Sequence, residues 1–175
     1  QTPRTYTRVL DQDGNVILEN SSSSEVVLKE STAYYMNTML QNVVTSGTGG
    51  EARFSGMHIA GKTGSTTSDY DRWFAGYTPY YTAVVWTGYE TPERVRSSGS
   101  NPAAVTWRRV MSQIHEGLAD QNFSSINNLV SVEYCLDSGL IATDACRSDP
   151  RGNRVASMTL LRADAPTGFC TVHSE

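Results

Sequence analysis

The chain has 175 residues, of which 38% are apolar, and a formal net charge of -4. This length allows one domain or slightly more around a single core. No apolar run approaches the roughly 20 residues of a membrane span, and no basic run offers a surface for nucleic-acid phosphates. The sequence therefore argues against a nucleic-acid partner, and any membrane anchor or export signal is expected upstream of Gln1.

A hairpin and a helix are the first elements expected along the chain. Residues 6–18 alternate in apolar character around Asp11 to Asn15, whose Asp-Gly and Gly-Asn pairs favour a tight turn. After a serine run, apolar residues recur at helical spacing, which predicts an amphipathic helix that begins near Lys29 and is stopped by Gly47. The apolar positions of this helix are Met36, Met39, Leu40, Val43 and Val44.

Three strands are expected next. Residues 57–60 are strand-like and lead into Gly61-Lys62-Thr63-Gly64-Ser65. Residues 73–77 and 81–89 are rich in Val, Tyr and Trp, which predicts two further strands with a tight antiparallel connection at Thr78-Pro79. The segment 81–89 is apolar enough to be predicted as a central strand.

A second helix is expected to pack on this sheet. Asn101 and Pro102 form a good cap and first-turn pair. The apolar stripe that follows consists of Ala104, Trp107, Met111, Ile114 and Leu118. Beyond Asp120 the periodicity fades. The class is therefore predicted as α+β, an antiparallel sheet flanked by helices over residues 1–120, followed by a small irregular appendage over residues 121–175.

Two motif interpretations compete around Lys62. Residues 56–63 fit the G-x-x-x-x-G-K-T spacing of a phosphate loop. The context is unfavourable, because residues 51–55 are not a buried strand and Gly64 to Asp69 are a poor helix start. Lys62-Thr63-Gly64 instead fits the K-T-G motif of serine acyl-transfer enzymes, placed at the exposed end of a strand.

The surroundings of this motif resemble the class A, bifunctional penicillin-binding proteins. The segments that carry the resemblance are residues 43–49, 60–66 and 71–79, in this order and spacing. The likeness covers most of residues 4–120 and implies the C-terminal part of the transpeptidase domain, with a partial serine β-lactamase-like fold.

The resemblance implies a peptidoglycan D,D-transpeptidase that cross-links stem peptides through an acyl-serine intermediate and binds β-lactams. It implies no cofactor and places the activity on the extracellular face of the bacterial cytoplasmic membrane, held there by an upstream anchor. Its expected partners are the stem peptide, β-lactams and a missing upstream half of the transpeptidase domain, beyond which a glycosyltransferase domain is expected.

The resemblance also assigns roles to the motif. Lys62 and Ser65 are the expected catalytic residues: Lys62 supplies positive charge, and the Ser65 N–H is one of two oxyanion donors. Thr63, Gly64, Ser65 and Thr66 are expected to bind substrate. The hydroxyls of Thr63 and Ser65 would hydrogen-bond the substrate carboxylate, and Gly64 would let the substrate lie along the strand.

The nucleophile motif S-x-x-K is absent. The only lysines are Lys29 and Lys62, and three residues before them stand Val26 and Ile59. Ser125-Ile126-Asn127 resembles the second motif of the family but follows the K-T-G segment, so we interpret it as coincidence. We expect the chain alone to be inactive and to be one piece of a larger domain. A non-catalytic wall-binding or interaction module is the alternative.

Three cysteines and a histidine mark the appendage: Cys135, Cys146, Cys170 and His173. Three thiolates and one imidazole form an accepted zinc set. The rival is a disulfide between two of the cysteines, which suits an enzyme that works outside the membrane. The disulfide is favoured, so no metal site is predicted and the four residues remain the alternative metal ligands.

Overall fold

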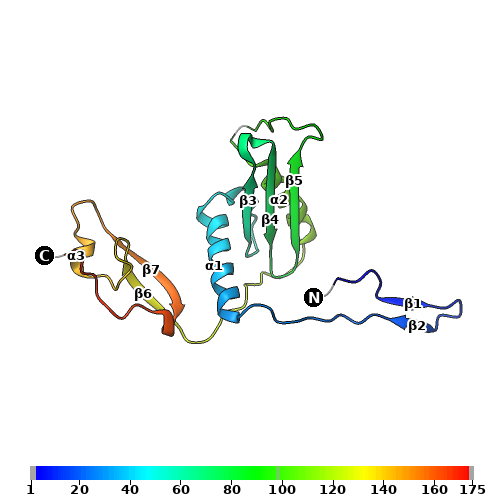
Figure 1. The fold of residues 1–175 in the computed structure, drawn as a ribbon, viewed down its shortest axis with the longest axis horizontal. Helices are drawn as coiled ribbons and strands as arrows, with labels where there is room; N and C mark the ends of the chain where they lie inside the picture. Colours follow the sequence, from blue (N-terminus) through cyan, green and yellow to red (C-terminus); the bar gives the residue numbers. More distant parts are fainter. Residues whose placement is uncertain (1–2, 98, 174–175) are drawn as a thin grey trace. The chain divides into compact units, whose positions relative to one another are not determined.

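The computed structural model describes residues 3–97 and 99–173, which fall into two compact units that divide between Glu30 and Ser31 (Figure 1). The first unit contains the predicted hairpin, strands β1 (Arg8–Leu10) and β2 (Val16–Glu19). The Asp11 carboxylate accepts hydrogen bonds from the backbone N–H groups of Asp13 and Asn15 at 2.9 and 2.8 Å. Gly14 has a φ of 86°, which glycine adopts without strain.

Helix α1 (Glu30–Ser46) begins and ends where the sequence indicates. The backbone N–H groups of Gly47 and Gly49 both donate to the carbonyl of Val43, at 3.1 and 2.9 Å. These bonds satisfy a carbonyl that the helix itself leaves unpaired. A short 3₁₀ turn, η1 (Gly50–Ala52), follows.

The predicted sheet consists of β3 (Ala60–Ser65), β4 (Asp71–Tyr77) and β5 (Thr82–Gly88), all antiparallel, in the order β3-β4-β5. The prediction that the segment 81–89 is central was wrong, because β4 is central and β5 pairs with β4 alone among the described strands. The apolar side chains of β5 point alternately to the two faces of the sheet. Val85 packs against the core, whereas Val84 and Trp86 remain 59% and 47% exposed.

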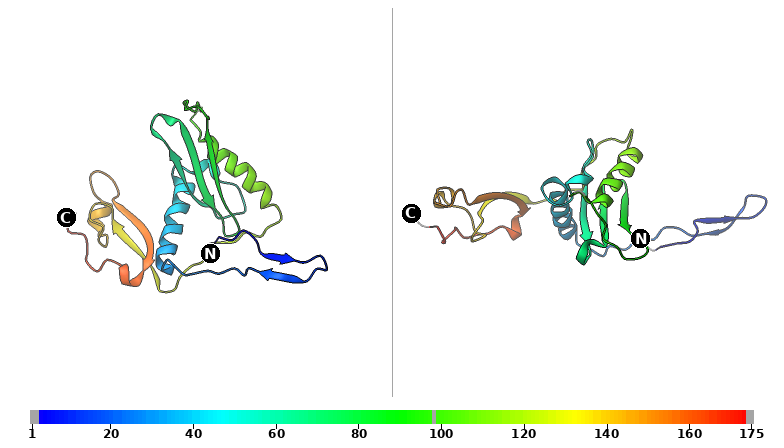
Figure 2. Two further views of the ribbon diagram at one scale, coloured as in Figure 1. Left: turned by 45° about the vertical axis from the view of Figure 1, so that its right-hand side comes forward. Right: turned by 90° about the horizontal axis from the view of Figure 1, so that it is seen from above.

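Helix α2 (Pro102–Ile114) packs on one face of this sheet (Figure 2). The side chain of Asn101 accepts a hydrogen bond from Ala103 N at 3.0 Å, which confirms the predicted cap. Trp107 and Met111 are fully buried, but Ile114 is 48% exposed, so the predicted stripe is correct only for its first part. His115 is buried after the last turn, with Nε2 2.8 Å from the Thr78 hydroxyl.

The core of the sheet joins α1, β4 and α2 through Val44, Phe74 and Trp107. The rings of Phe74 and Trp107 meet edge to face with centroids 5.1 Å apart. A Cβ at Gly76 would lie 2.5 Å from the Phe74 ring and 3.0 Å from the Trp107 ring. Glycine at this position is what lets the two aromatic rings pack against the strand.

The remaining residues, 129–173, form what we call the cysteine region. Strands β6 (Leu129–Cys135) and β7 (Val155–Leu161) pair antiparallel, with the one-turn helix α3 (Asp144–Arg147) between them and a 3₁₀ turn, η3 (Arg162–Asp164), after them. The appendage is therefore more regular than expected, while the α+β class is confirmed. No helix in the described parts of the chain is long and apolar enough to cross a bilayer.

Candidate functional site

The K-T-G motif, residues 62–64, lies in the middle of β3, and its residues alternate between the two faces of the sheet. Thr63 lies opposite Phe74, and Gly64 lies opposite Trp73. Because directly opposed residues of an antiparallel pair share a face, Thr63 and Ser65 lie on the α2 face. Lys62 and Gly64 lie on the other face.

The outer edge of β3 is unpaired within the described chain. Thr66 N donates to Asp71 O at 3.2 Å, so the N–H of every second residue of β3 points toward β4. The alternation of an antiparallel ladder then directs the Ser65 N–H and the Thr63 carbonyl away from the sheet. Lys62 Nζ donates to this carbonyl at 2.9 Å and lies 3.4 Å from the Thr63 hydroxyl. The ammonium group therefore lies at the open edge, although its strand position faces away from α2.

A polar groove of about 480 Å³ lies beside the motif. Its lining includes Thr48, Thr63, Ser65, Arg72 and Glu51. The hydroxyls of Thr48 and Thr63 are 2.9 Å apart, and Arg72 Nη1 donates to Ser65 Oγ at 3.2 Å. Hydroxyls beside a guanidinium are suited to binding a carboxylate.

Arg72 is the site residue that the sequence analysis missed. It lies opposite Ser65 in the register, and Arg72 Nη2 forms an ion pair with Asp69 Oδ1 at 3.1 Å. Its buried Nε has no hydrogen-bond partner among the described residues. The signal was present, because Arg72 stands inside the segment 71–79 that carried the resemblance. To predict that Arg72 lies opposite Ser65, however, one must know the length of the turn between β3 and β4, which sets the register of the two strands.

Glu51 places a negative charge beside Arg72 in the groove, but its carboxylate is already bound to a backbone group. Glu51 Oε2 accepts a hydrogen bond from Asn101 N at 2.6 Å, at the start of α2. This contact uses the carboxylate as a structural acceptor close to the positive end of the helix dipole.

Thr66 lies outside the residues that line the groove. Its hydroxyl accepts from Asp71 N at 2.9 Å and lies 3.2 Å from Asp71 Oδ2. The other carboxylate oxygen of Asp71 accepts from Trp86 Nε1 at 2.8 Å. Thr66 thus helps to close the end of the β3–β4 hairpin.

The phosphate-loop interpretation is wrong. Gly61, Lys62 and Thr63 are part of an extended strand, and the segment after them is a 3₁₀ turn, η2 (Thr67–Asp69), rather than a helix. A phosphate loop needs a curved backbone before a helix N-terminus. Ser125 and Asn127 lie in an exposed irregular segment between α2 and β6, and neither lines the groove.

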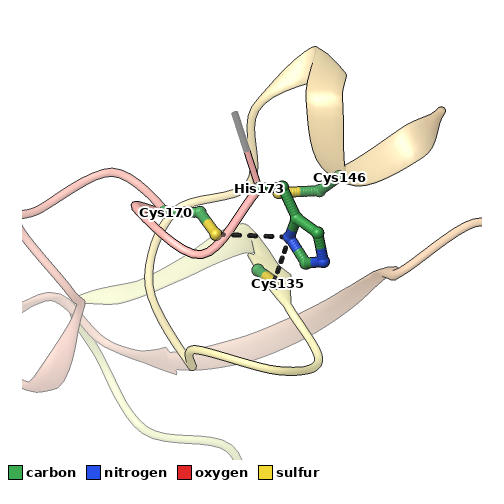
Figure 3. A group of neighbouring side chains, drawn as sticks. All are labelled: Cys135, Cys146, Cys170 and His173. Carbon is green, nitrogen blue, oxygen red and sulfur yellow. Dashed lines mark hydrogen bonds between the residues drawn. The ribbon is translucent and has the colours of Figure 1, made fainter. Parts of the chain in front are cut away.

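The three cysteines carry free thiols, so the favoured disulfide is absent from the structure. Their sulfur atoms and one ring nitrogen of His173 instead all lie within 4.8 Å of one another (Figure 3). The sequence analysis placed these residues in one appendage but could not see that all four converge.

Two family models match the chain. Residues 2–112 match the penicillin binding protein transpeptidase domain, and residues 126–175 match the penicillin-binding protein 1A C-terminal domain. Penicillin-binding protein 1A of Clostridium perfringens is 37% identical over 98% of this chain, and penicillin-binding protein 1F of Bacillus subtilis is 33% identical over 65% of it. The chain spans only 21% and 17% of the length of these two relatives.

Solved structures share the fold. Penicillin-binding protein 1A from Haemophilus influenzae superposes with a TM-score of 0.69 at 16% sequence identity, over 97% of this chain and 30% of that one. The D,D-transpeptidase domain of a peptidoglycan glycosyltransferase from Eggerthella lenta gives a TM-score of 0.50 at 24% identity, over 62% of this chain and 26% of that one.

Proposed function

The chain belongs to the penicillin-binding protein transpeptidase family, and from this premise we propose that it supplies the substrate-binding strand of a peptidoglycan D,D-transpeptidase. The reaction joins stem peptides through an acyl-serine intermediate, and β-lactams bind at the same place as mimics of the peptide. The observation that carries this proposal is the open edge of β3, which lies beside a groove lined by hydroxyls and a guanidinium.

The edge of β3 offers backbone groups to an extended peptide. Ser65 N–H and Thr63 C=O point away from β4 and can pair with a peptide that adds to the sheet as a further strand. In this pose the Ser65 N–H also serves as one of two oxyanion donors to the reacting carbonyl. The second donor is expected from the segment that carries the nucleophile.

The side chains around the edge bind the terminal carboxylate of the peptide. The hydroxyls of Thr63 and Ser65 donate hydrogen bonds to it, and Arg72, which already contacts Ser65 Oγ, adds a positive charge. Lys62 adds a second positive charge at the edge and helps to order the proton transfers around the nucleophile.

Gly64 and Thr66 support this arrangement. A Cβ at Gly64 would lie 3.2 Å from Trp73 Cβ, tighter than an ordinary contact, so a larger residue would press on the neighbouring strand. Thr66, a further substrate-binding candidate, holds the strand end through Asp71. Both residues thus help to hold β3 against β4 where the peptide would pair with it.

The nucleophile is proposed to come from the upstream half of the same domain, because the 175 residues contain no S-x-x-K. The sheet face opposite α2 supports such a partner. Trp73 and Trp86 are directly opposed there and are 43% and 47% exposed, and Val84 on the same face is 59% exposed. Adjacent apolar side chains of this size favour burial under another part of a protein.

The chain is proposed to divide at about residue 120 into a transpeptidase portion and a C-terminal appendage. The two family models, which match on either side of this position, support the division. The transpeptidase portion would act on the outer face of the cytoplasmic membrane, anchored by a segment upstream of this chain.

Intact-mass analysis after incubation with a labelled penicillin tests the function. We expect no adduct on this chain alone and one adduct, on the upstream serine, in a polypeptide that also contains the upstream half. A Thr63→Val variant of that polypeptide should acylate more slowly, whereas Thr5→Val, distant from β3 in sequence, is the matched control. An adduct on this chain alone would contradict the proposed division of the site.

A non-catalytic wall-binding module is the second candidate, which the absence of S-x-x-K from these 175 residues permits. This function predicts that the longer polypeptide binds stem peptide without ever forming an adduct. Equilibrium binding combined with the intact-mass result separates the two functions.

A further inference from the structure

The buried residues of the cysteine region are almost all cysteines. Cys135 and Cys146 are fully buried and Cys170 is 7% exposed, while Leu160 is the one other buried residue described between positions 129 and 173. A region this small cannot bury enough apolar surface to be stable by that means alone. The thiols therefore occupy the place where a larger domain has its hydrophobic core.

The four side chains reach this point from three separate parts of the region. Cys135 ends β6, Cys146 lies in α3, and Cys170 and His173 come from the C-terminal tail (Figure 3). Backbone hydrogen bonds of 2.8 Å hold each cysteine in place: Cys135 N donates to Leu140 O, Arg154 N donates to Cys146 O, and Cys170 N donates to Ile141 O.

The spacing of the donor atoms matches a tetrahedral metal centre. Zn–S distances of about 2.3 Å and Zn–N distances of about 2.0 Å place tetrahedral ligands about 3.8 Å apart for two sulfurs and about 3.5 Å apart for nitrogen and sulfur. His173 Nδ1 lies 3.3 Å from Cys135 Sγ and 3.4 Å from Cys170 Sγ. The four ligand atoms, one from each residue, all lie within 4.8 Å of one another.

A second layer of contacts orients the imidazole. His173 Nε2 lies 3.0 Å from a carboxylate oxygen of both Asp137 and Asp149. Arg151 Nη2 is 3.2 Å from the same nitrogen, but a guanidinium cannot accept a proton, so the two carboxylates decide that Nε2 carries the hydrogen. The lone pair of Nδ1 is then directed at the sulfur atoms, as in a histidine that binds a metal.

Backbone N–H groups also point at the sulfur atoms. Asp137 N donates to Cys135 Sγ and Thr143 N donates to Cys146 Sγ, each at 3.4 Å. The turn that allows the first of these bonds closes at Gly139, whose φ is 72° and whose N–H donates to Cys135 O at 2.8 Å. Such donors stabilise the negative charge of a thiolate, which is the form that binds a metal.

We propose that Cys135, Cys146, Cys170 and His173 bind one Zn²⁺ ion in a closed structural site. Three thiolates and one imidazole complete a tetrahedron and leave no open position, so the ion holds the region together rather than performing chemistry. Binding forms three Zn–S bonds and one Zn–N bond, and the thiol protons pass to water. The carboxylates of Asp137 and Asp149 act as positioning groups for His173.

Metal analysis of the 175-residue chain tests the site. The chain is purified without chelator, equilibrated with Zn²⁺ and dialysed, and then examined by elemental analysis and native mass spectrometry. We expect one zinc per chain, and thiols that react with a chromogenic disulfide reagent only after a chelator is added. A chain that retains no zinc, with three reactive thiols or with a disulfide and one thiol, would overturn the proposal.

Variants locate the ion. Cys146→Ser should lose the zinc, whereas His58→Asn, which changes an exposed histidine outside the cluster, should retain it. The three tryptophans lie at positions 73, 86 and 107, so their emission reports whether the rest of the chain stays folded in the cysteine variant. Equal zinc content in both variants would overturn the assignment of ligands.

The second layer has its own test. Asp137→Asn should weaken zinc binding about 10- to 100-fold, the usual cost of losing such a partner. Asp144→Asn is the control, because the Asp144 side chain is fully exposed and, among the described residues, its one ion pair is with Arg147 at 3.9 Å. Co²⁺ in place of Zn²⁺ adds a spectroscopic readout. We expect the absorption of a tetrahedral thiolate complex, with weaker sulfur-to-metal bands in Cys146→Ser, and an octahedral spectrum would contradict the site.

Discussion

The sheet region, residues 30–115, and the cysteine region have different kinds of side chain buried at their centres. The first closes around an aromatic and aliphatic core that contains Phe74, Trp107 and Met111. The second has three thiols and a histidine at its centre. Strands of similar length thus surround two different centres, one of apolar side chains removed from water and one of potential metal ligands that converge on one point.

Metal removal is the change with the largest expected effect on this contrast. If zinc holds the cysteine region together, a chelator should abolish the protection of β6 and β7 amides against hydrogen exchange, because little apolar core remains to hold the strands. The amides of β3, β4 and β5 should keep their protection. Exchange measured by mass spectrometry with and without chelator checks this, and equal loss in both regions would contradict the contrast.

Trp107→Ala should damage the sheet region alone. Removing this fully buried ring leaves a cavity beside Phe74, which we expect to cost about 3 to 5 kcal/mol of the free energy of unfolding. Urea unfolding followed by circular dichroism measures the loss, and the zinc content should stay the same. Trp86→Ala is the matched control, because Trp86 is 47% exposed and its loss removes mainly one hydrogen bond, worth about 1 kcal/mol.

Lys62→Ala should slow acylation without affecting either core. In a polypeptide that contains the upstream serine, we expect the second-order rate with a labelled penicillin to fall about 100-fold or more, as for other lost groups that stabilise developing charge. Lys29, the only other lysine, gives the matched control Lys29→Ala, which should acylate at the original rate. Equal rates for both variants would remove Lys62 from the site.

Asn101→Ala has the smallest expected effect. The variant loses the cap of α2, and we expect the free energy of unfolding to fall by about 1 kcal/mol. Asn101→Ser keeps an acceptor for Ala103 N, so it should recover most of the loss, but it lacks the hydrogen bond of 3.1 Å that Asn101 Nδ2 donates to Trp73 O. Urea unfolding of the two variants side by side distinguishes the cap from the contact with β4.

Local features were predicted well from the sequence. The ends of α1, the turn at Asp11 and the cap at Asn101 follow from residues close in the chain, since glycine, aspartate and asparagine act on their own backbone neighbourhood. The strand that carries Lys62 was also found, because its motif is continuous in sequence. The roles assigned to Lys62, Thr63, Gly64, Ser65 and Thr66 stay predictions.

Features that depend on pairing were missed or mistaken. The apolar character of β5 suggested a central strand. In the structure Val85 points to the buried face of the sheet, whereas Val84 points to the exposed face. Arg72 escaped notice because its contact with Ser65 depends on the register between two strands. The sequence analysis did not detect the pairing of β6 with β7, because polar residues surround both strands.

The sequence by itself determined the family resemblance, the α+β class, the position of the K-T-G strand and the absence of S-x-x-K. Each of these depends on residue types and their order along the chain. Only the tertiary structure decided which face of the sheet each motif residue occupies and that the Arg72 guanidinium contacts Ser65 in the groove. It also decided that four side chains meet at one point, those of Cys135, Cys146, Cys170 and His173. Spacing along a chain does not measure distance in space, and a thiol joins a disulfide or a metal site according to which groups the fold places beside it.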